Sequence, residues 1–180
     1  MIINEFITKV IIYCVLYFVS LWIGNKIRSN RYNREIPIRI YEGKVLAAIS
    51  CMDGYEFEDF MAFIFKQLGY RVKQTPRSGD GGKDLILKGK DGVIYVECKR
   101  YSGENKVSRG LVQKLVGATV SDGYDKCLFV TTSDYTKEAR EYAANCKGVN
   151  VEIYNLDDIL KICKQCNFAM VEEMIDLQLS

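Results

Sequence analysis

The stretch Asp84–Lys99, DLILKGKDGVIYVECK, decides the fold predicted for this chain. It holds two short apolar runs joined by Gly89-Lys90-Asp91-Gly92, a pattern typical of two strands and a tight turn. Side chains alternate between the two faces of a strand, so Glu97 and Lys99 are predicted to share one face. If the strands pair through the turn, Asp84 at the start of the first lies close to both. The hairpin therefore predicts two carboxylates and one ammonium at one end.

Such a cluster suits a hard divalent cation. Mg²⁺ takes oxygen ligands, keeps several waters and is commonly held by one or two carboxylates plus a substrate phosphate. Charged residues are also common on exposed strand ends, so a surface hairpin with merely solvated charges is the alternative.

The wider sequence contains a series of segments known from one group of enzymes. Asp84 followed by Glu97-Cys98-Lys99 resembles the D…(D/E)xK signature of the PD-(D/E)xK nuclease superfamily. From about Tyr55 to Leu160 the chain resembles the catalytic domain of Mrr-like restriction endonucleases. The segments that carry this resemblance are Phe57-Glu58, Leu68-Gly69-Tyr70, the run from Ser78 to Leu85, the run from Val96 to Tyr101, Val130-Thr131-Thr132 and Glu138-Ala139-Arg140.

The resemblance implies a fold and a reaction. The fold is α/β, a restriction-endonuclease-like core with a mixed central sheet flanked by helices. The reaction is metal-dependent internal cleavage of double-stranded DNA, in restriction or defence against foreign DNA. By hypothesis, Asp84, Glu97 and the carbonyl of Cys98 hold Mg²⁺, for which Mn²⁺ can substitute, while Lys99 orients the attacking water and stabilises the transition state. Many relatives have Gln in place of Glu97, and Glu keeps the ordinary superfamily ligand.

Glu58 is a further candidate for the catalytic site. Apolar residues recur at helical spacing over Tyr55–Leu68, and Gly69 ends the pattern. On that helix Glu58 falls at the margin of the buried face, from where it can reach the hairpin. In Mrr-like nucleases the corresponding glutamate is thought to assist the metal site; the alternative is an ordinary charge on the flank of a helix.

Five residues are predicted to contact nucleic acid. The segment Pro76–Lys83 is a glycine-rich loop that lacks the Walker A pattern, so ATP is not expected as its ligand. Backbone approach to a phosphate is the preferred interpretation, and a flexible connector is the alternative. Arg100 adds positive charge beside Lys99, and the helix expected over Val107–Val120 carries a polar residue whose direction the helical wheel leaves open. The predicted contacts are Arg77, Ser78, Lys83, Arg100 and Gln113.

Composition narrows the chemistry. The chain has 180 residues, 48% of them hydrophobic, and a net charge of only +2, so it is globular and any polyanion site must come from local clustering. Seven scattered cysteines argue against a disulfide framework. There is no histidine, which excludes imidazole-based catalysis and zinc sites that need imidazole. Cys163-Lys164-Gln165-Cys166 is a single CxxC, interpreted as partly buried helix thiols.

The N-terminus is predicted to form a membrane anchor over residues 1–27, centred on the apolar run Val10–Ile23. A single-pass helix is favoured over a cleaved signal peptide or a buried helix. The basic residues that follow predict a cytoplasmic C-terminal bulk in the cell membrane. Residues 28–50 are interpreted as a basic juxtamembrane linker, with a short extended piece at Ile36–Tyr41 and a lead-in helix at Val45–Met52, and residues 51–180 as the catalytic domain.

Beyond the hairpin, apolar patterns predict strands at Lys126–Thr132 and Val149–Tyr154 alternating with helices, hence a partly parallel sheet. The segment Met170–Leu179 is predicted to form an amphipathic C-terminal helix. It either packs on the domain or joins two copies of the chain in a homodimer. The anchor occupies the place of the separate DNA-recognition domain of Mrr proper, so sequence specificity is undefined. Two rival functions remain: a catalytically inactive, membrane-tethered DNA-binding or interaction protein, and a nuclease acting on RNA or single strands.

Overall fold

The computed structural model describes residues 17, 19–21, 23, 38–76 and 82–179, without the side chains of 177–179. The chain divides into two compact units, Met1–Gly43 and Lys44–Ser180, and the fold is that of the second unit. Among the described residues, no helix has the length and apolar character that crossing a bilayer requires. Most of the predicted anchor, residues 1–27, lies outside the described residues.

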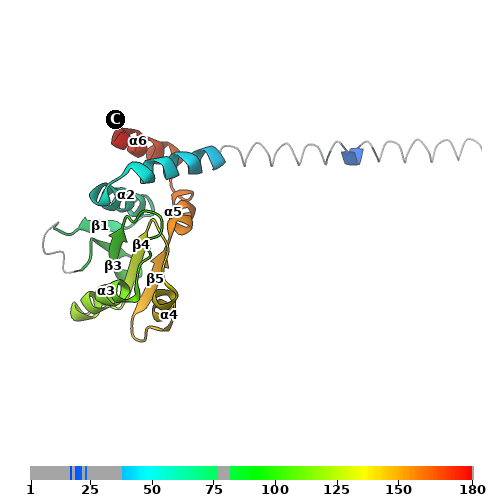
Figure 1. Cartoon of the computed structure of the whole chain (residues 1–180). Coiled ribbons are helices and arrows are strands. Elements are labelled where there is room, and N and C mark those ends of the chain that lie inside the picture. The colour runs from blue at the N-terminus through cyan, green and yellow to red at the C-terminus, as the bar shows by residue number, and fades with distance from the viewer. Residues whose placement is uncertain (1–16, 18, 22, 24–37, 77–81, 180) are drawn as a thin grey trace, which may run out of the picture. The chain divides into compact units, whose positions relative to one another are not determined.

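A five-stranded sheet forms the centre of the second unit (Figure 1), with strands in the order β1-β2-β3-β4-β5. The first three strands pair antiparallel, and the last three pair parallel. This confirms the prediction of a mixed sheet with antiparallel strands first. The strands are β1 (Arg71–Gln74), β2 (Leu85–Gly89), β3 (Gly92–Lys99), β4 (Lys126–Thr131) and β5 (Asn150–Tyr154).

The β2–β3 hairpin forms as the sequence predicts. Its register pairs Leu85 with Val96 and Gly89 with Gly92 across a two-residue turn. Gly92 has φ 108°, a conformation that side chains with a Cβ rarely adopt, so glycine suits the tight turn. Cys98 and Val96 are buried, 3% and 0% exposed, on the face opposite Glu97.

Helices cover both faces of the sheet. On one face, α3 and α4 pack over Tyr95 and Phe129, both buried. On the other, α2 contacts the first three strands and α5 contacts β5, while α6 packs against α2. The helices are α2 (Gly54–Gln67), α3 (Arg109–Ser121), α4 (Lys137–Asn145), α5 (Leu156–Cys163) and α6 (Phe168–Leu179).

Local sequence features determine where α2 begins and which of its faces is buried. Asp53 accepts from the backbone N–H of Glu56, whose side chain accepts in return from the Asp53 N–H, a complete capping box. The helical apolar stripe is fully inside: Phe57, Phe60 and Ile64 are each 0% exposed. Full burial of such a side chain stabilises the fold by about 1.5–3 kcal/mol.

One predicted segment is wrong. Residues 38–51 form a single helix, so the extended piece expected at Ile36–Tyr41 is not found over its described part, whereas the lead-in helix expected at Val45–Met52 is present. Helical spacing of Val45, Ala48 and Ile49, all buried, explains the continuity from Lys44 onward.

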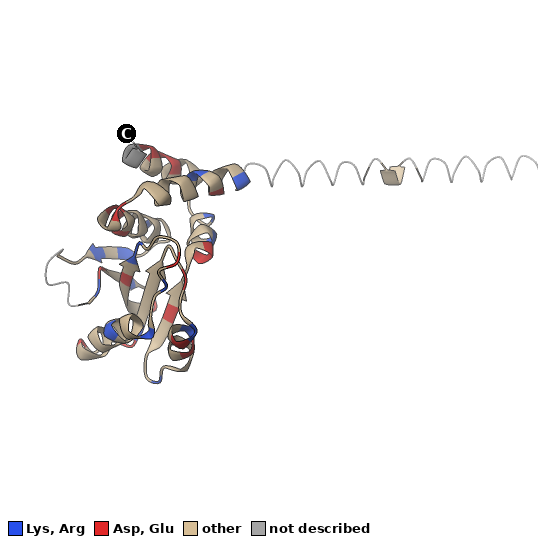
Figure 2. Ribbon diagram, viewed as in Figure 1, with Lys and Arg blue, Asp and Glu red and all other residues tan. Residues whose placement is uncertain are grey.

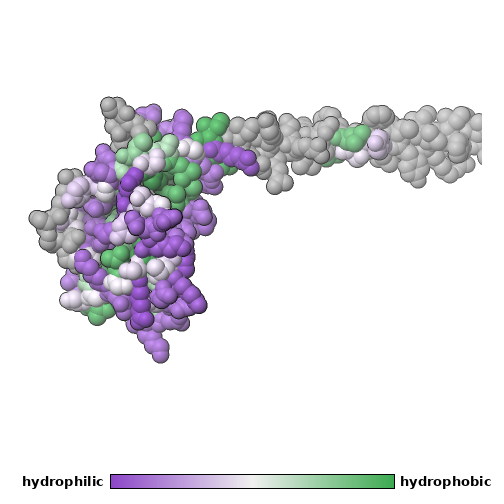
Figure 3. Space-filling view, viewed as in Figure 1, coloured by the Kyte–Doolittle hydropathy of each residue, from purple (hydrophilic) through white to green (hydrophobic). Residues whose placement is uncertain are grey.

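The surface divides by polarity. β1 is an edge strand that carries Lys and Arg (Figure 2), and its exposed Arg71 and Lys73 discourage pairing with another chain. Figure 3 shows hydrophobic surface along the helix of residues 38–51, where Ile40 is 58% and Leu46 38% exposed.

Candidate active site

The hairpin places Asp84 beside the end of β3. Its backbone N–H donates to the Val96 carbonyl at 2.7 Å, and its carbonyl accepts from the Thr75 N–H at 2.9 Å. The pairing of Leu85 with Val96 puts Asp84 opposite Glu97, on the same face of the sheet. The backbone of Asp84 is therefore held between β1 and β3.

Two carboxylates flank one ammonium at this point. The Lys99 Nζ lies 2.7 Å from Glu97 Oε1 and 3.8 Å from Asp84 Oδ2. Asp84 Oδ2 also accepts the backbone N–H of Cys98 at 2.7 Å. The predicted convergence of Asp84, Glu97 and Lys99 is thus present in the structure.

Both carboxylates are inside the protein. Asp84 is 7% exposed and Glu97 is 4% exposed. Burial raises the pKa of Glu97, while its hydrogen bond from Lys99 and the charge of Lys114 oppose that rise. Among the described residues, Glu97 Oε2 is the one buried side-chain oxygen or nitrogen without a hydrogen-bond partner. Such an atom calls for a missing ligand, because leaving it unpaired costs about 1–3 kcal/mol.

Lys99 is charged in this setting. Burial by itself would lower the pKa of its ammonium, but the hydrogen bond to Glu97 and the negative charges of Glu97, Asp84 and Glu58 together raise that pKa above its ordinary value. A protonated lysine cannot accept a proton, so its contribution in the metal-free protein is electrostatic.

Glu58 reaches the cluster from α2. Burial, and next the charge of Asp84, raise its pKa from 4.5 to about 7, and Lys99 opposes the shift. Glu58 is half-buried and lies near enough to Asp84, Lys99 and Glu97 for their charges to act on it. A carboxyl with this pKa exchanges a proton near neutral pH.

Replacing Glu58 by glutamine is expected to stabilise the metal-free protein at about pH 8 by on the order of 1 kcal/mol. The folded pKa lies above the ordinary one, so the folded state binds more protons than the unfolded state between the two values. Stability contributed by Glu58 therefore falls as pH rises through the window from 4.5 to about 7. Urea unfolding at about pH 5 and pH 8 with a chelator measures this; Glu173→Gln, on exposed α6 surface, is the control. An unchanged pH dependence in Glu58→Gln would contradict the assignment.

The backbone of Cys98, rather than its thiol, faces the carboxylate cluster. Lys99 O accepts from Thr132 N–H and so faces β4, while the Cys98 N–H faces Asp84. Since N–H and C=O of one strand residue point to the same side, the Cys98 carbonyl also faces the Asp84 side, as a metal ligand would. The thiol is on the other face, where burial raises its pKa well above 9.0.

Two of the predicted DNA contacts are already used within the protein. Lys83 Nζ lies 2.8 Å from Asp122 Oδ2 and is only 13% exposed, and Arg100 Nη2 donates to the Ser50 carbonyl near the end of helix 38–51. Both side chains therefore have partners inside the protein before any nucleic acid is bound. Gln113 is exposed on α3. Arg77 and Ser78 lie outside the described residues.

A preformed metal cage is not present: within the described ranges, no three His, Cys, Asp or Glu side chains are arranged to hold an ion. One or two carboxylates suffice for Mg²⁺ when waters and a phosphate complete its shell, and the unpartnered Glu97 Oε2 beside Asp84 fits that requirement.

A profile of one protein family matches residues 49–163, more than half of the chain, and its description is "Restriction endonuclease", Mrr_cat. The chain belongs to the Mrr_cat restriction endonuclease family. The match contains every element from α2 to α5 and all three cluster residues, so it confirms the resemblance found in the sequence.

Relatives of this Mrr_cat chain are longer proteins. The uncharacterized protein y4cE of Sinorhizobium fredii is 28% identical over 158 residues, which cover 79% of this chain and 40% of that protein. The type IV methyl-directed restriction enzyme EcoKMrr of Escherichia coli K12 is 31% identical over 101 residues, 52% of this chain and 33% of the enzyme. The chain thus spans less than half the length of either.

A solved structure supports the fold of the Mrr_cat chain. The DNA modification-dependent restriction endonuclease AspBHI superposes with a TM-score of 0.57 at 19% identity, over 77% of this chain and 40% of that one. The α/β restriction-endonuclease-like core with its mixed sheet, expected from the sequence, is confirmed.

Sequence reasoning did not single out Lys114 of α3. Its charge acts on Glu97, whereas the predicted contact was its neighbour Gln113. Lys114 lies on the exposed side of α3, away from the buried Val112 and Leu115, so the hydrophobic pattern of the helix gave no signal that could single it out.

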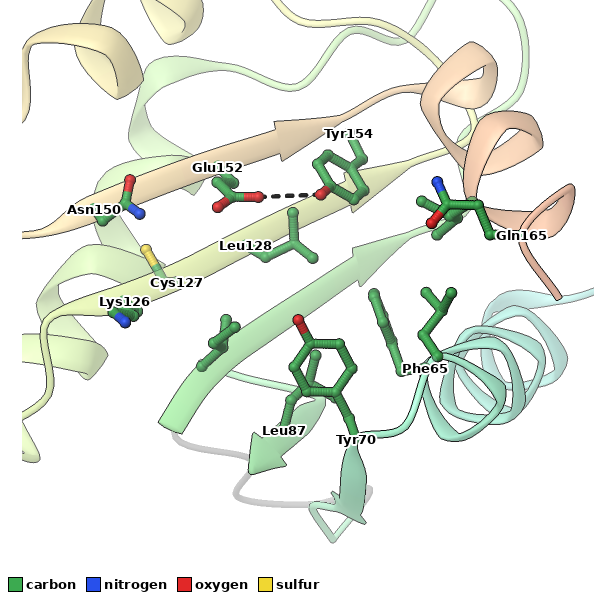
Figure 4. A pocket seen from close by; sticks show the side chains of 13 residues that line it. Phe65, Tyr70, Leu87, Lys126, Cys127, Leu128, Asn150, Glu152, Tyr154 and Gln165 are labelled. Atoms are coloured by element: carbon green, nitrogen blue, oxygen red, sulfur yellow. Dashed lines mark hydrogen bonds between the residues drawn. The ribbon is translucent and has the colours of Figure 1, made fainter. Parts of the chain in front are cut away.

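A cavity of about 300 Å³ lies on the opposite face of the sheet (Figure 4). Phe65, Tyr70 and Leu128 are among its lining residues, and the Tyr154 hydroxyl donates to Glu152 at 3.1 Å. None of Asp84, Glu97 and Lys99 lines it. The cavity is separate from the carboxylate cluster.

Proposed function

We propose that this Mrr_cat chain is a metal-dependent endonuclease that hydrolyses phosphodiester bonds in double-stranded DNA, in restriction or defence against foreign DNA. The observation that carries the proposal is the buried pair Asp84 and Glu97 around Lys99, with Glu97 Oε2 left without a partner. Family membership supports the same reaction.

Restriction endonuclease folds generally use divalent metal ions, and Mg²⁺, with Mn²⁺ as substitute, is the ion proposed here. Asp84, Glu97 and the Cys98 carbonyl would hold it. When bound, the ion would activate water and neutralise charge that develops on the phosphoryl oxygens.

The protein's own groups then have distinct tasks. In hydrolysis, the water oxygen bonds to phosphorus, the bond from phosphorus to the leaving sugar oxygen breaks, and that oxygen takes up a proton. Lys99, charged and 29% exposed on its side chain, is placed to bind a phosphoryl oxygen and to stabilise the added negative charge. Glu58, with its pKa of about 7, is placed to take up a proton near neutral pH.

Incubation of supercoiled plasmid with the full chain tests the reaction. We expect nicked and linear products with Mg²⁺ or Mn²⁺ and none with a chelator. Asp84 and Glu97 are negatively charged, so a bound cation is needed to neutralise the phosphate. Binding without cleavage under both metals would favour the rival of an inactive DNA-binding protein. Cleavage of RNA or single-stranded DNA but not duplex would change the substrate, and cleavage in chelator would refute the metal.

We also propose that residues 1–27 anchor the chain in the cell membrane, with the catalytic domain in the cytoplasm. The apolar run Val10–Ile23 supports this, as do the described Tyr17, Val19 and Leu21, which are helical and exposed. Protease treatment of right-side-out vesicles should spare the C-terminal domain; its digestion there would overturn the topology. A homodimer through α6 stays a prediction, testable by the mass of the purified chain in solution.

A further inference from the structure

Lys114 lies at the edge of the active site because α3 runs beside the segment that leads into Asp84. A Cβ added to Gly82 would lie 3.3 Å from Lys114 Cε and 3.6 Å from its Cγ. The aliphatic stem of Lys114 therefore rests against Gly82, two residues before Asp84. Gly82 also has φ 84°, so the chain needs glycine there for two reasons.

A polar network fixes this contact. Asp122, the C-cap residue of α3, accepts from Lys83 Nζ and from the Tyr95 hydroxyl, both at 2.8 Å. The Lys83 ammonium also lies 4.5 Å from the centre of the Tyr95 ring. These bonds tie the segment before Asp84 to α3 and to β3, so the distance of Lys114 from the site is set by the fold.

Without a metal ion, the site carries more negative charge than Lys99 alone can neutralise. Glu58, Asp84 and Glu97 bring up to three negative charges, and the one ammonium among them, that of Lys99, is already bound between two carboxylates. A DNA phosphate adds another negative charge and is repelled unless further positive charge is near.

Lys114 has the charge and the freedom for this role. It is exposed, and its aliphatic stem lies against Gly82, two residues before Asp84. Within the part of the chain that the structure describes, its ammonium makes no hydrogen bond or ion pair, in contrast to Lys83 and Lys99.

We propose that Lys114 is a phosphate-binding residue of this site: it contacts the DNA backbone next to the Asp84–Glu97 pair, the role that the sequence suggested for Lys83 and Gln113. The inference rests on the proposed function, and it adds a residue from α3 that neither the D…ExK pattern nor the family match assigns.

Binding of a labelled DNA duplex to the full chain in chelator, over a range of salt concentrations, tests the proposal without requiring cleavage. Lys114→Gln should weaken binding about tenfold at low salt and reduce the slope of log affinity against log salt by about 1, since one phosphate contact is lost. Lys114→Arg should keep both. The control is Lys147→Gln, an exposed lysine between α4 and β5, at the sheet end opposite Lys99.

The outcomes separate this proposal from the nuclease itself. If wild type cleaves plasmid and Lys114→Gln binds and cleaves like it, Lys114 is excluded and the nuclease stands. If wild type never cleaves but Lys114→Gln alone loses affinity and salt slope, the phosphate contact stands and catalysis does not. A wild type that neither binds duplex in chelator nor cleaves plasmid with Mg²⁺ or Mn²⁺ overturns both. Equal thermal unfolding of Lys114→Gln and Lys147→Gln excludes a general loss of folding as the cause.

Discussion

Asp84→Asn is expected to slow plasmid cleavage by at least about a hundredfold while leaving the protein folded. Asparagine keeps the volume of the side chain, and its amide oxygen can still accept the Cys98 N–H that Asp84 Oδ2 accepts at 2.7 Å. What the change removes is the negative charge beside Glu97, and with it half of the carboxylate pair proposed to hold the metal. The initial rate of loss of supercoiled plasmid measures the effect.

Lys99→Ala should slow plasmid cleavage by a similar factor, for a different reason. It removes the ammonium from between two buried carboxylates, so their pKa values should rise and the fold should lose stability as well. Comparing Asp84→Asn with Lys99→Ala separates the negative charge proposed to hold the metal from the positive charge proposed to bind the phosphate.

The control is Asp91→Asn, the same isosteric change in the exposed turn at the other end of the same hairpin. It should cleave at the wild-type rate. Cleavage that survives both Asp84→Asn and Lys99→Ala would reject the proposed active site, whatever the binding results.

Phe129→Ala should lower the free energy of unfolding by about 3–5 kcal/mol. Phe129 is 0% exposed in the middle of β4, and its ring packs edge-on against Tyr135 with ring centres 6.1 Å apart. It is also the register partner of Glu97, so the cavity left by alanine opens beside the carboxylate cluster. Because domains are stable by only about 5–15 kcal/mol in total, partial unfolding at room temperature is expected.

Phe168→Ala provides the matched control, since it deletes the same side chain at a position 40% exposed on α6. It should cost about 1 kcal/mol or less. Urea unfolding of both variants measures the difference. Equal losses would contradict the burial assigned to β4.

The sequence by itself determined the hairpin and the meeting of Asp84, Glu97 and Lys99. The reason is local: alternation along a strand and a two-residue turn set the register, and the register sets which side chains share a face. The helix α2 and its marginal Glu58 followed from helical spacing in the same way. The family segments agree with these elements in order.

Only the tertiary structure decided how the remaining charges are used. Lys83 meets Asp122 at the end of α3, Arg100 meets the Ser50 carbonyl, and Lys114 lies against Gly82 because α3 packs on the segment before Asp84. Each partner lies far away in the chain, and a charged side chain takes the nearest opposite charge or carbonyl that packing supplies. A residue pattern predicts which face of its own helix or strand a side chain occupies. Which partner the side chain meets depends on the distances between elements, and packing of the complete core sets those distances.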